Sequence, residues 1–254
     1  MADEQRPWWI RIVSTLVAPS VLLAIHVFPH TYVFIISCVV WFSFFVLLHV
    51  KYHVEKHQTA LNSMTAVSFI ILLLLIESLY MRWFLVGASV FIFFFIAYWS
   101  EPRIEHAIHI KEKPLRRMMM MLYVFNVYAL FVALFAVHIY FNQLSFALLS
   151  IIGGVYAATG AYMIWSLYFK FTFEQLVVWC ILVLLSIVEI MWVMKLLPFG
   201  YFASAFLLVW LWYIVQLFVR FHLSLTGILW KRQKWFLGVN AFLFFVVLYV
   251  IKWI

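Results

Sequence analysis

Two histidines and two glutamates are the residues best able to do chemistry within the long apolar runs of this 254-residue sequence. The interval from His26 to His138 is the same as the interval from Glu77 to Glu189. An ionisable group inside a membrane is costly unless it is paired, hydrated or functional. The repeated His and Glu therefore predict a shared binding site.

Three kinds of chemistry fit this set of four. Two imidazoles and two carboxylates are suitable ligands for a divalent metal such as zinc, iron or manganese. Because histidine titrates near neutral pH, alternating His and Glu side chains could also bind or pass protons. His26 and His138 could instead ligate a haem from opposite faces. The alternative is structural: the polar ends reach the lipid headgroups, and Glu77 pairs with Arg82.

A second group of histidines lies in the polar segments HVKYHVEKH and EHAIH. His49, His53 and His57 are spaced i, i+4 and i+8, which would place them on one face of a helix. His106 and His109 are spaced i and i+3. These five are further candidate metal ligands, although no HExxH or paired-cysteine motif accompanies them. A solvated face at the membrane surface explains the same spacing without a metal.

The composition indicates that lipid is the solvent for most of the chain. Hydrophobic residues make up 69% of the sequence and charged residues 10%, whereas soluble domains are about half apolar and a quarter charged. The net charge of +8 does not indicate a nucleic-acid partner, because the basic residues lie in loops between apolar runs. We therefore predict an all-α integral membrane protein whose partners include membrane lipids.

The apolar runs predict about nine transmembrane helices. They cover residues 8–28, 31–50, 64–81, 83–100, 117–140, 144–169, 174–196, 199–221 and 235–253. If two neighbouring runs form a re-entrant pair instead, the number of spans falls to eight.

The loops predict the orientation of these helices. Tight connections at FPHT, YMRW, YFNQ and LLPFG alternate with longer polar ones, of which KYHVEKHQTALN is the first. Of the 17 Lys and Arg, only Arg82, Lys195 and Lys252 fall on the side of the tight connections. By the positive-inside rule the N-terminus is cytoplasmic, four helical hairpins point outward, and the C-terminus follows an odd ninth helix to the opposite side.

The matching polar residues predict an internal duplication. With a one-residue slip near position 82, Arg82 also matches Lys195 and Gly87 matches Gly200. We expect two four-helix repeats over 1–112 and 113–230, with an additional C-terminal helix over 231–254. Because each repeat has an even number of helices, both insert the same way up, in parallel topology. Chance matching within a biased composition is the alternative.

Three classes of function remain open. The first is a membrane-embedded binding or transport unit that handles a cation, proton or small ligand near its outer face through the His/Glu set. The second is a non-catalytic structural or assembly subunit, which would join an oligomer or larger complex through the C-terminal helix. The third is a metal- or haem-dependent membrane enzyme. The absence of a Gly-rich phosphate loop, nucleophile elbow or cofactor fingerprint favours a role that is not enzymatic.

Overall fold

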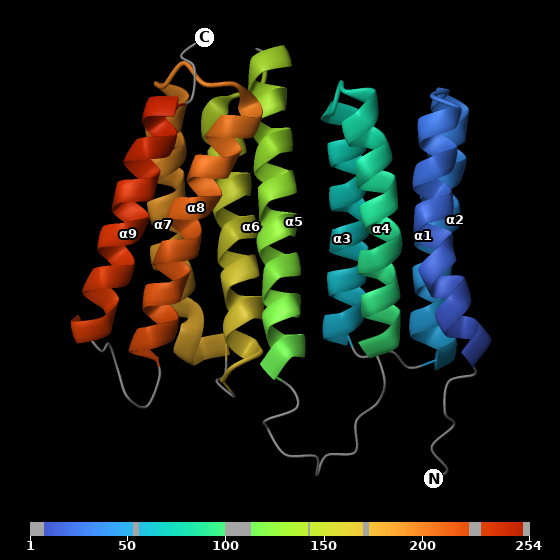
Figure 1. Ribbon diagram of the computed structural model, residues 1–254, viewed down its shortest axis with the longest axis horizontal. Coiled ribbons are helices and arrows are strands. Elements are labelled where there is room, and N and C mark those ends of the chain that lie inside the picture. The colour runs from blue at the N-terminus through green and yellow to red at the C-terminus, as the bar shows by residue number, and fades with distance from the viewer. Residues whose placement is uncertain are drawn as a thin grey trace. The chain divides into compact units, whose positions relative to one another are not determined.

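The computed structural model describes residues 8–52, 56–99, 113–141, 143–169, 173–223 and 230–250. Within these ranges the chain forms nine α-helices and no β-strand (Figure 1). The helices are α1 (Trp8–Val27), α2 (Thr31–Tyr52), α3 (Lys56–Leu75), α4 (Leu79–Trp99), α5 (Lys113–Tyr140), α6 (Phe146–Ser166), α7 (Phe173–Lys195), α8 (Tyr201–His222) and α9 (Trp230–Val250). The predicted all-α architecture is confirmed.

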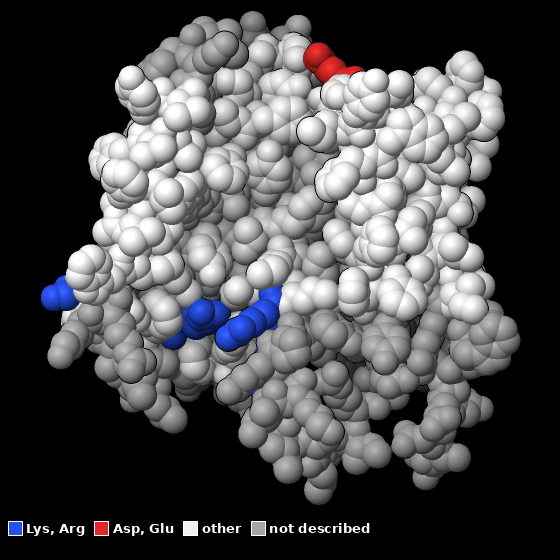
Figure 2. Space-filling model, in the orientation of Figure 1, with Lys and Arg blue, Asp and Glu red and all other residues white. Residues whose placement is uncertain are grey.

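Six of the described helices, α4 to α9, are long and apolar enough to cross a membrane. In α1, α2 and α3 the described apolar segments are shorter, at Thr15–Val27, Thr31–Phe44 and Ala60–Leu75. Figure 2 shows that most of the described surface on the visible face is uncharged, with Lys and Arg side chains visible only in its lower half and an acidic side chain at its upper edge. Several long apolar helices are typical of a multi-pass integral membrane protein.

Three of the four predicted tight turns fall between consecutive helices, namely α1 and α2, α5 and α6, and α7 and α8. The first and last are built around a proline. The amide of His30 donates to the carbonyl of Phe28 at 2.7 Å, and the amide of Phe199 donates to Leu197 at 2.8 Å. A hydrogen bond across three residues defines a γ-turn, and the fixed φ of the central proline suits its inverse form.

The predicted turn at YMRW is wrong. Helix α3 ends at Leu75 and α4 begins at Leu79, so residues 76–78 form the turn and Arg82 lies inside α4. The predicted long connection at 51–62 is also wrong, because α2 continues to Tyr52 and α3 already begins at Lys56. Polar residues there are compatible with helix, since Lys, Gln, Ala and Leu all have good helix propensity. Helix α3 thus begins and ends earlier than predicted, and the polar residues Glu77 and Ser78 lie in the turn that follows it.

The chain divides into two compact units, Met1–Leu122 (unit 1) and Tyr123–Ile254 (unit 2). In unit 1 the most closely packed pair of helices is α1 with α4. Helix α1 contributes the buried side chains of Ala18, Leu22 and Ile25, whose spacing of four and three residues places them on one face.

In unit 2 the most closely packed pair is α6 with α7. Helix α6 carries buried small residues at Gly153, Gly154, Ala157, Ala158, Gly160 and Ala161. A Cβ atom added to Gly154 would lie 3.0 Å from the backbone oxygen of Leu184 in α7. Small residues let membrane helices approach closely, so this stripe explains why α6 and α7 pack so tightly.

Two tryptophans join α6 and α8 by reciprocal hydrogen bonds. The indole of Trp165 in α6 donates to the backbone oxygen of Gln216, and Trp212 in α8 donates to that of Ala157, both at 3.1 Å. Both indoles are fully buried. These bonds satisfy indole N–H groups that would otherwise be unpaired in an apolar interior.

Candidate functional site

The structure places His26 and His138 in similar positions in their units. His26 is the penultimate residue of α1, and His138 lies two residues before the end of α5. Both side chains are partly buried. The Nδ1 atom of each is buried and has no hydrogen-bond partner within the described part of the chain. A buried nitrogen without a partner is costly, so each imidazole is suited to bind a ligand.

The two glutamates have exposed side chains, unlike the partly buried histidines. Glu77 lies in the turn between α3 and α4, outside both helices, and its side chain is exposed. The prediction that Glu77 belongs to a helix over residues 64–81 is therefore wrong. Glu189 does lie within α7, but its side chain is also exposed.

The second group of histidines is divided between helices. His49 belongs to α2 and His57 to α3, so they do not share one helix face as predicted. The side chains of both, and all of His53, His106 and His109, fall outside the described residues. Among the described side chains, no group of three or more His, Cys, Asp or Glu could hold a metal ion. The metal and haem assignments therefore stay predictions.

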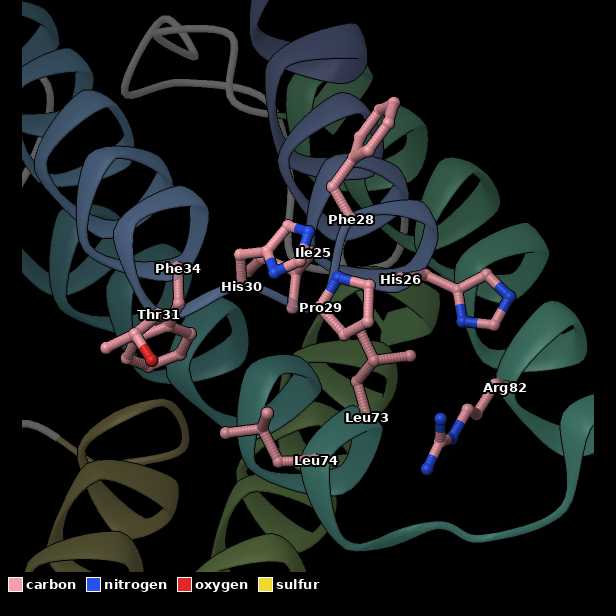
Figure 3. Close-up of a pocket in the computed structure, with 10 residues that line it drawn as sticks. All are labelled: Ile25, His26, Phe28, Pro29, His30, Thr31, Phe34, Leu73, Leu74 and Arg82. Carbon is pink, nitrogen blue, oxygen red and sulfur yellow. The ribbon is translucent and has the colours of Figure 1, made fainter.

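A pocket of about 350 Å³ opens at the end of unit 1 where α1 turns into α2 (Figure 3). It is lined by Ile25, His26, Phe28, Pro29, His30, Thr31, Phe34, Leu73, Leu74 and Arg82. In Figure 3, His26 and Arg82 lie on one side of Pro29, and His30, Thr31 and Phe34 lie on the other. We call this the unit 1 pocket. It contains one predicted residue, His26, but not Glu77.

The proline turn and two helices position the polar side chains of the unit 1 pocket. The γ-turn at Pro29 places His30 and Thr31 at the start of α2, close to the end of α1. The ring of His30 stacks on that of Tyr32, with 5.3 Å between centroids. The ring of His26 packs edge-on against Trp83 of α4 at 4.8 Å. Both imidazoles are thereby held by aromatic neighbours.

Arg82 enters the unit 1 pocket from α4. Its Nε donates a hydrogen bond to the backbone oxygen of Ile76, across the turn between α3 and α4. This bond orients the guanidinium, and the fork of donors on its terminal nitrogens matches the geometry of a carboxylate or phosphate. The pocket therefore combines a fixed cation with two imidazoles.

Sequence reasoning missed His30, Thr31 and Arg82 as members of the site. His30 and Thr31 were recognised only as parts of the tight FPHT turn. Arg82 was recognised as a repeat match to Lys195, and then only as a partner for Glu77. The usable signal was the short proline connection, because residues on both sides of such a turn must lie close together.

Unit 2 contains a related cluster, formed by His138, Phe146, Trp192 and Lys195. The imidazole of His138 lies 4.6 Å from the ring of Phe146, between centroids. The Nζ of Lys195 lies 4.7 Å from the centroid of Phe146 and 5.2 Å from that of Trp192. We call these four residues the unit 2 cluster.

Three positions of the unit 2 cluster correspond to residues that line the unit 1 pocket. Phe34 precedes Phe146 by the same interval that separates His26 from His138. Arg82 matches Lys195 once the one-residue slip near position 82 is included. Each unit thus brings together a histidine, a phenylalanine and a cation from three different helices.

No family model, curated protein or solved structure matches this chain. The residues of this chain and their geometry are therefore the basis for proposing its function.

Proposed function

We propose that this protein is a membrane-embedded binding unit, and that its ligand is a small anion or an anionic group held in the unit 1 pocket. The observation that carries this proposal is that His26, His30 and Arg82 all line one cavity. Guanidinium and imidazole groups are typical partners of carboxylate and phosphate oxygens. If the protein is a transporter, this pocket would bind the ligand that it carries across the membrane.

The sequence predicts a cation, a proton or a small ligand. Among these, the lining of the pocket favours a small ligand that is an anion. None of the ten described residues that line it is Asp or Glu, and Arg82 is positively charged at any physiological pH. A metal cation would face this charge without a compensating carboxylate. An anion would instead be attracted by Arg82 and could accept a hydrogen bond from the unpartnered Nδ1 of His26 when that nitrogen is protonated.

The apolar part of the pocket favours a ligand that is only partly charged. Ile25, Phe28, Phe34, Leu73 and Leu74 supply apolar surface beside the polar groups. Ligand sites commonly combine such walls with a few polar groups that fix orientation. The ligand is therefore an anionic group attached to apolar atoms, or a small anion beside a lipid chain.

We also propose the nine-span topology with outward hairpins and a cytoplasmic N-terminus, which places the unit 1 pocket at the outer face. Helices α1, α2 and α3 have 20, 22 and 20 residues. At about 1.5 Å per residue, each is close to the roughly 30 Å thickness of the hydrocarbon layer. Labelling of an exposed Glu77→Cys variant from outside intact cells tests this orientation, with Arg117→Cys as the cytoplasmic control. Labelling of Arg117→Cys but not Glu77→Cys would reverse it.

Anion-dependent stabilisation of the purified chain tests the binding proposal. The protein is placed in nanodiscs of zwitterionic lipid, and its thermal unfolding is followed with inorganic phosphate, acetate, sodium or zinc ions. Ligand at 100 times its Kd stabilises the folded state by about 2.7 kcal/mol. We expect phosphate or acetate to raise the Tm of the wild-type protein at constant ionic strength, and both cations to leave it unchanged.

Variants assign this stabilisation to the pocket. Arg82→Gln should remove most of the anion effect, Arg82→Lys should retain part of it, and Arg220→Gln should retain all of it. Arg220 is a suitable control because it is an arginine that does not line the pocket; its guanidinium lies 4.7 Å from the centroid of Tyr168. Stabilisation by zinc or sodium but not by anions would contradict the proposal, as would an unchanged anion effect in Arg82→Gln.

A further inference from the structure

Unit 2 presents a histidine and a cation around one aromatic ring, without a function so far assigned to them. We propose that the unit 2 cluster is a second site for an oxyanion of the phosphate class, so that each chain holds two such groups. This inference rests on the proposed function of the unit 1 pocket. It goes beyond that function by assigning a separate site and a stoichiometry.

Two nitrogen-containing side chains of the unit 2 cluster contact the same aromatic ring. His138 lies 4.6 Å from Phe146, and the Nζ of Lys195 lies 4.7 Å from the same ring. The faces of Phe146 and Trp192 attract the ammonium through their quadrupoles but carry no net negative charge. The cluster therefore keeps the positive charge of Lys195, whose side chain is exposed, and remains attractive to an anion.

His138 has a ring nitrogen that a bound oxyanion could satisfy. Its Nδ1 is buried, and within the described residues it has no hydrogen-bond partner. An oxyanion is a suitable partner, because it can accept from Nδ1 when that nitrogen carries the proton. Headgroup contact by Lys195 alone would explain the lysine, but it would not explain an unpartnered imidazole nitrogen beside it.

Three residues of the unit 2 cluster correspond in sequence to residues that line the unit 1 pocket. The matched pairs are His26 with His138, Phe34 with Phe146, and Arg82 with Lys195. The match is incomplete, because the position equivalent to His30 is Asn142. A lysine is also a point charge rather than a two-pronged donor. We therefore expect the second site to bind phosphate several-fold more weakly than the first.

Equilibrium dialysis with radiolabelled inorganic phosphate counts the sites in the full-length chain. The protein is held in nanodiscs of zwitterionic lipid, and binding is measured at constant ionic strength. We expect two sites per chain in the wild type, one in Lys195→Gln, one in Arg82→Gln and none in the double variant. Arg220→Gln is the matched control and should keep two.

The remaining unit 1 site provides an internal check on folding in Lys195→Gln, and Lys195→Arg should restore the second site. One site in the wild type, lost in Arg82→Gln and kept in Lys195→Gln, would overturn the second site but leave the proposed function intact. No phosphate binding by any form would overturn both.

A parallel set of nanodiscs containing an anionic phospholipid distinguishes the source of the phosphate group. If lipid headgroups fill the sites, the two dialysable phosphates per chain should be displaced in these nanodiscs. If free phosphate is the ligand, both should remain bound. Either result retains two sites, and each identifies a different source.

Discussion

The imidazole of His26 meets the indole of Trp83 edge to face, with 4.8 Å between ring centroids and 82° between ring planes. This contact joins the end of α1 to the first turns of α4, the most closely packed pair of helices in unit 1. Trp83 follows Arg82 directly in the sequence, so the same turn of α4 supplies both the neighbour of the imidazole and the cation of the pocket. We therefore expect Trp83 to hold the imidazole of His26 in place in the unit 1 pocket.

Replacing Trp83 with leucine should weaken anion binding without removing any charge. An aromatic pair of this geometry contributes about 0.5–1.5 kcal/mol beyond its buried area. We expect Trp83→Leu to lower the Tm slightly and to reduce the phosphate-dependent increase in Tm. Tyr80→Leu is the matched control, because Tyr80 lies in the same helix and is 87% exposed. Equal phosphate effects in the two variants would show that Trp83 does not position His26.

The close approach of α6 and α7 predicts opposite effects for two glycine substitutions. A Cβ at Gly154 would meet the Leu184 backbone oxygen at 3.0 Å, whereas at Gly87 in α4 nothing lies within 4 Å. We expect Gly154→Ala to destabilise the protein by about 1–3 kcal/mol through overpacking. Gly87→Ala should be neutral or stabilising by up to about 1 kcal/mol, because alanine has the higher helix propensity. Reversible denaturation in detergent compares them, and equal stability of both variants would be evidence against this packing.

The hydrogen bond from Trp212 to the Ala157 carbonyl predicts a stability loss when the indole is removed. Trp212 is fully buried, so Trp212→Phe leaves the carbonyl without this donor and creates a small void. We expect a loss of about 1–3 kcal/mol in the free energy of unfolding. Trp235→Phe in α9 should cost much less, since Trp235 is 75% exposed. A cost for Trp212→Phe no larger than for Trp235→Phe would be inconsistent with a bond that joins α6 to α8.

Asn240 predicts how α9 is attached to unit 2. Its Oδ1 accepts a hydrogen bond at 3.1 Å from the indole of Trp210 in α8, while much of α9 exposes apolar side chains. We expect Asn240→Leu to increase amide hydrogen exchange along α9 and leave α6 unchanged. The control Val239→Leu changes a 53% exposed neighbour and should have no such effect. Unchanged exchange in Asn240→Leu would mean that other contacts hold α9.

The sequence predicted the helical class well because the apolar runs are long and the composition is extreme. It was less successful at the end of α3. Arg82 interrupts the apolar run, so the turn was expected beside it, whereas the chain turns at residues 76–78. A long arginine side chain can reach polar groups from within a helix, as Arg82 does by bonding to the Ile76 carbonyl. The charge of Arg82 therefore indicated that a turn lies nearby, but the turn is at residues 76–78 and not beside Arg82.

The candidate site was predicted only in part for a related reason. His26 was identified because an ionisable residue in an apolar run is conspicuous, and Glu77 was chosen by the same criterion. The two residues differ in their exposure to the surroundings: the side chain of Glu77 is exposed in a turn, whereas the Nδ1 of His26 is buried. The short proline turn could have indicated His30, but Arg82 joins the site through the packing of α4 on α1, which spacing along the chain does not encode.

The predicted duplication does not extend to the residues through which α2 and α6 pack on their neighbouring helices. In the alignment that pairs His26 with His138, the small residues of α6 correspond to larger ones in α2, with Gly153 matching Trp41 and Gly154 matching Phe42. Helices α2 and α3 pack much less closely than α6 and α7. Any common origin of the two units would therefore lie in the end sites rather than in identical helix packing.

Direct observation of His26 during an anion titration tests the central claim. The protein is labelled with 15N-histidine, and the His26 signals are assigned by their loss in His26→Asn. We predict that inorganic phosphate, added at constant pH and ionic strength, shifts the His26 Nδ1 signal in the wild type and leaves it in place in Arg82→Gln. An unmoved His26 signal in the wild type at saturating phosphate, or an equal shift in Arg82→Gln, would contradict an anion site built from these two residues.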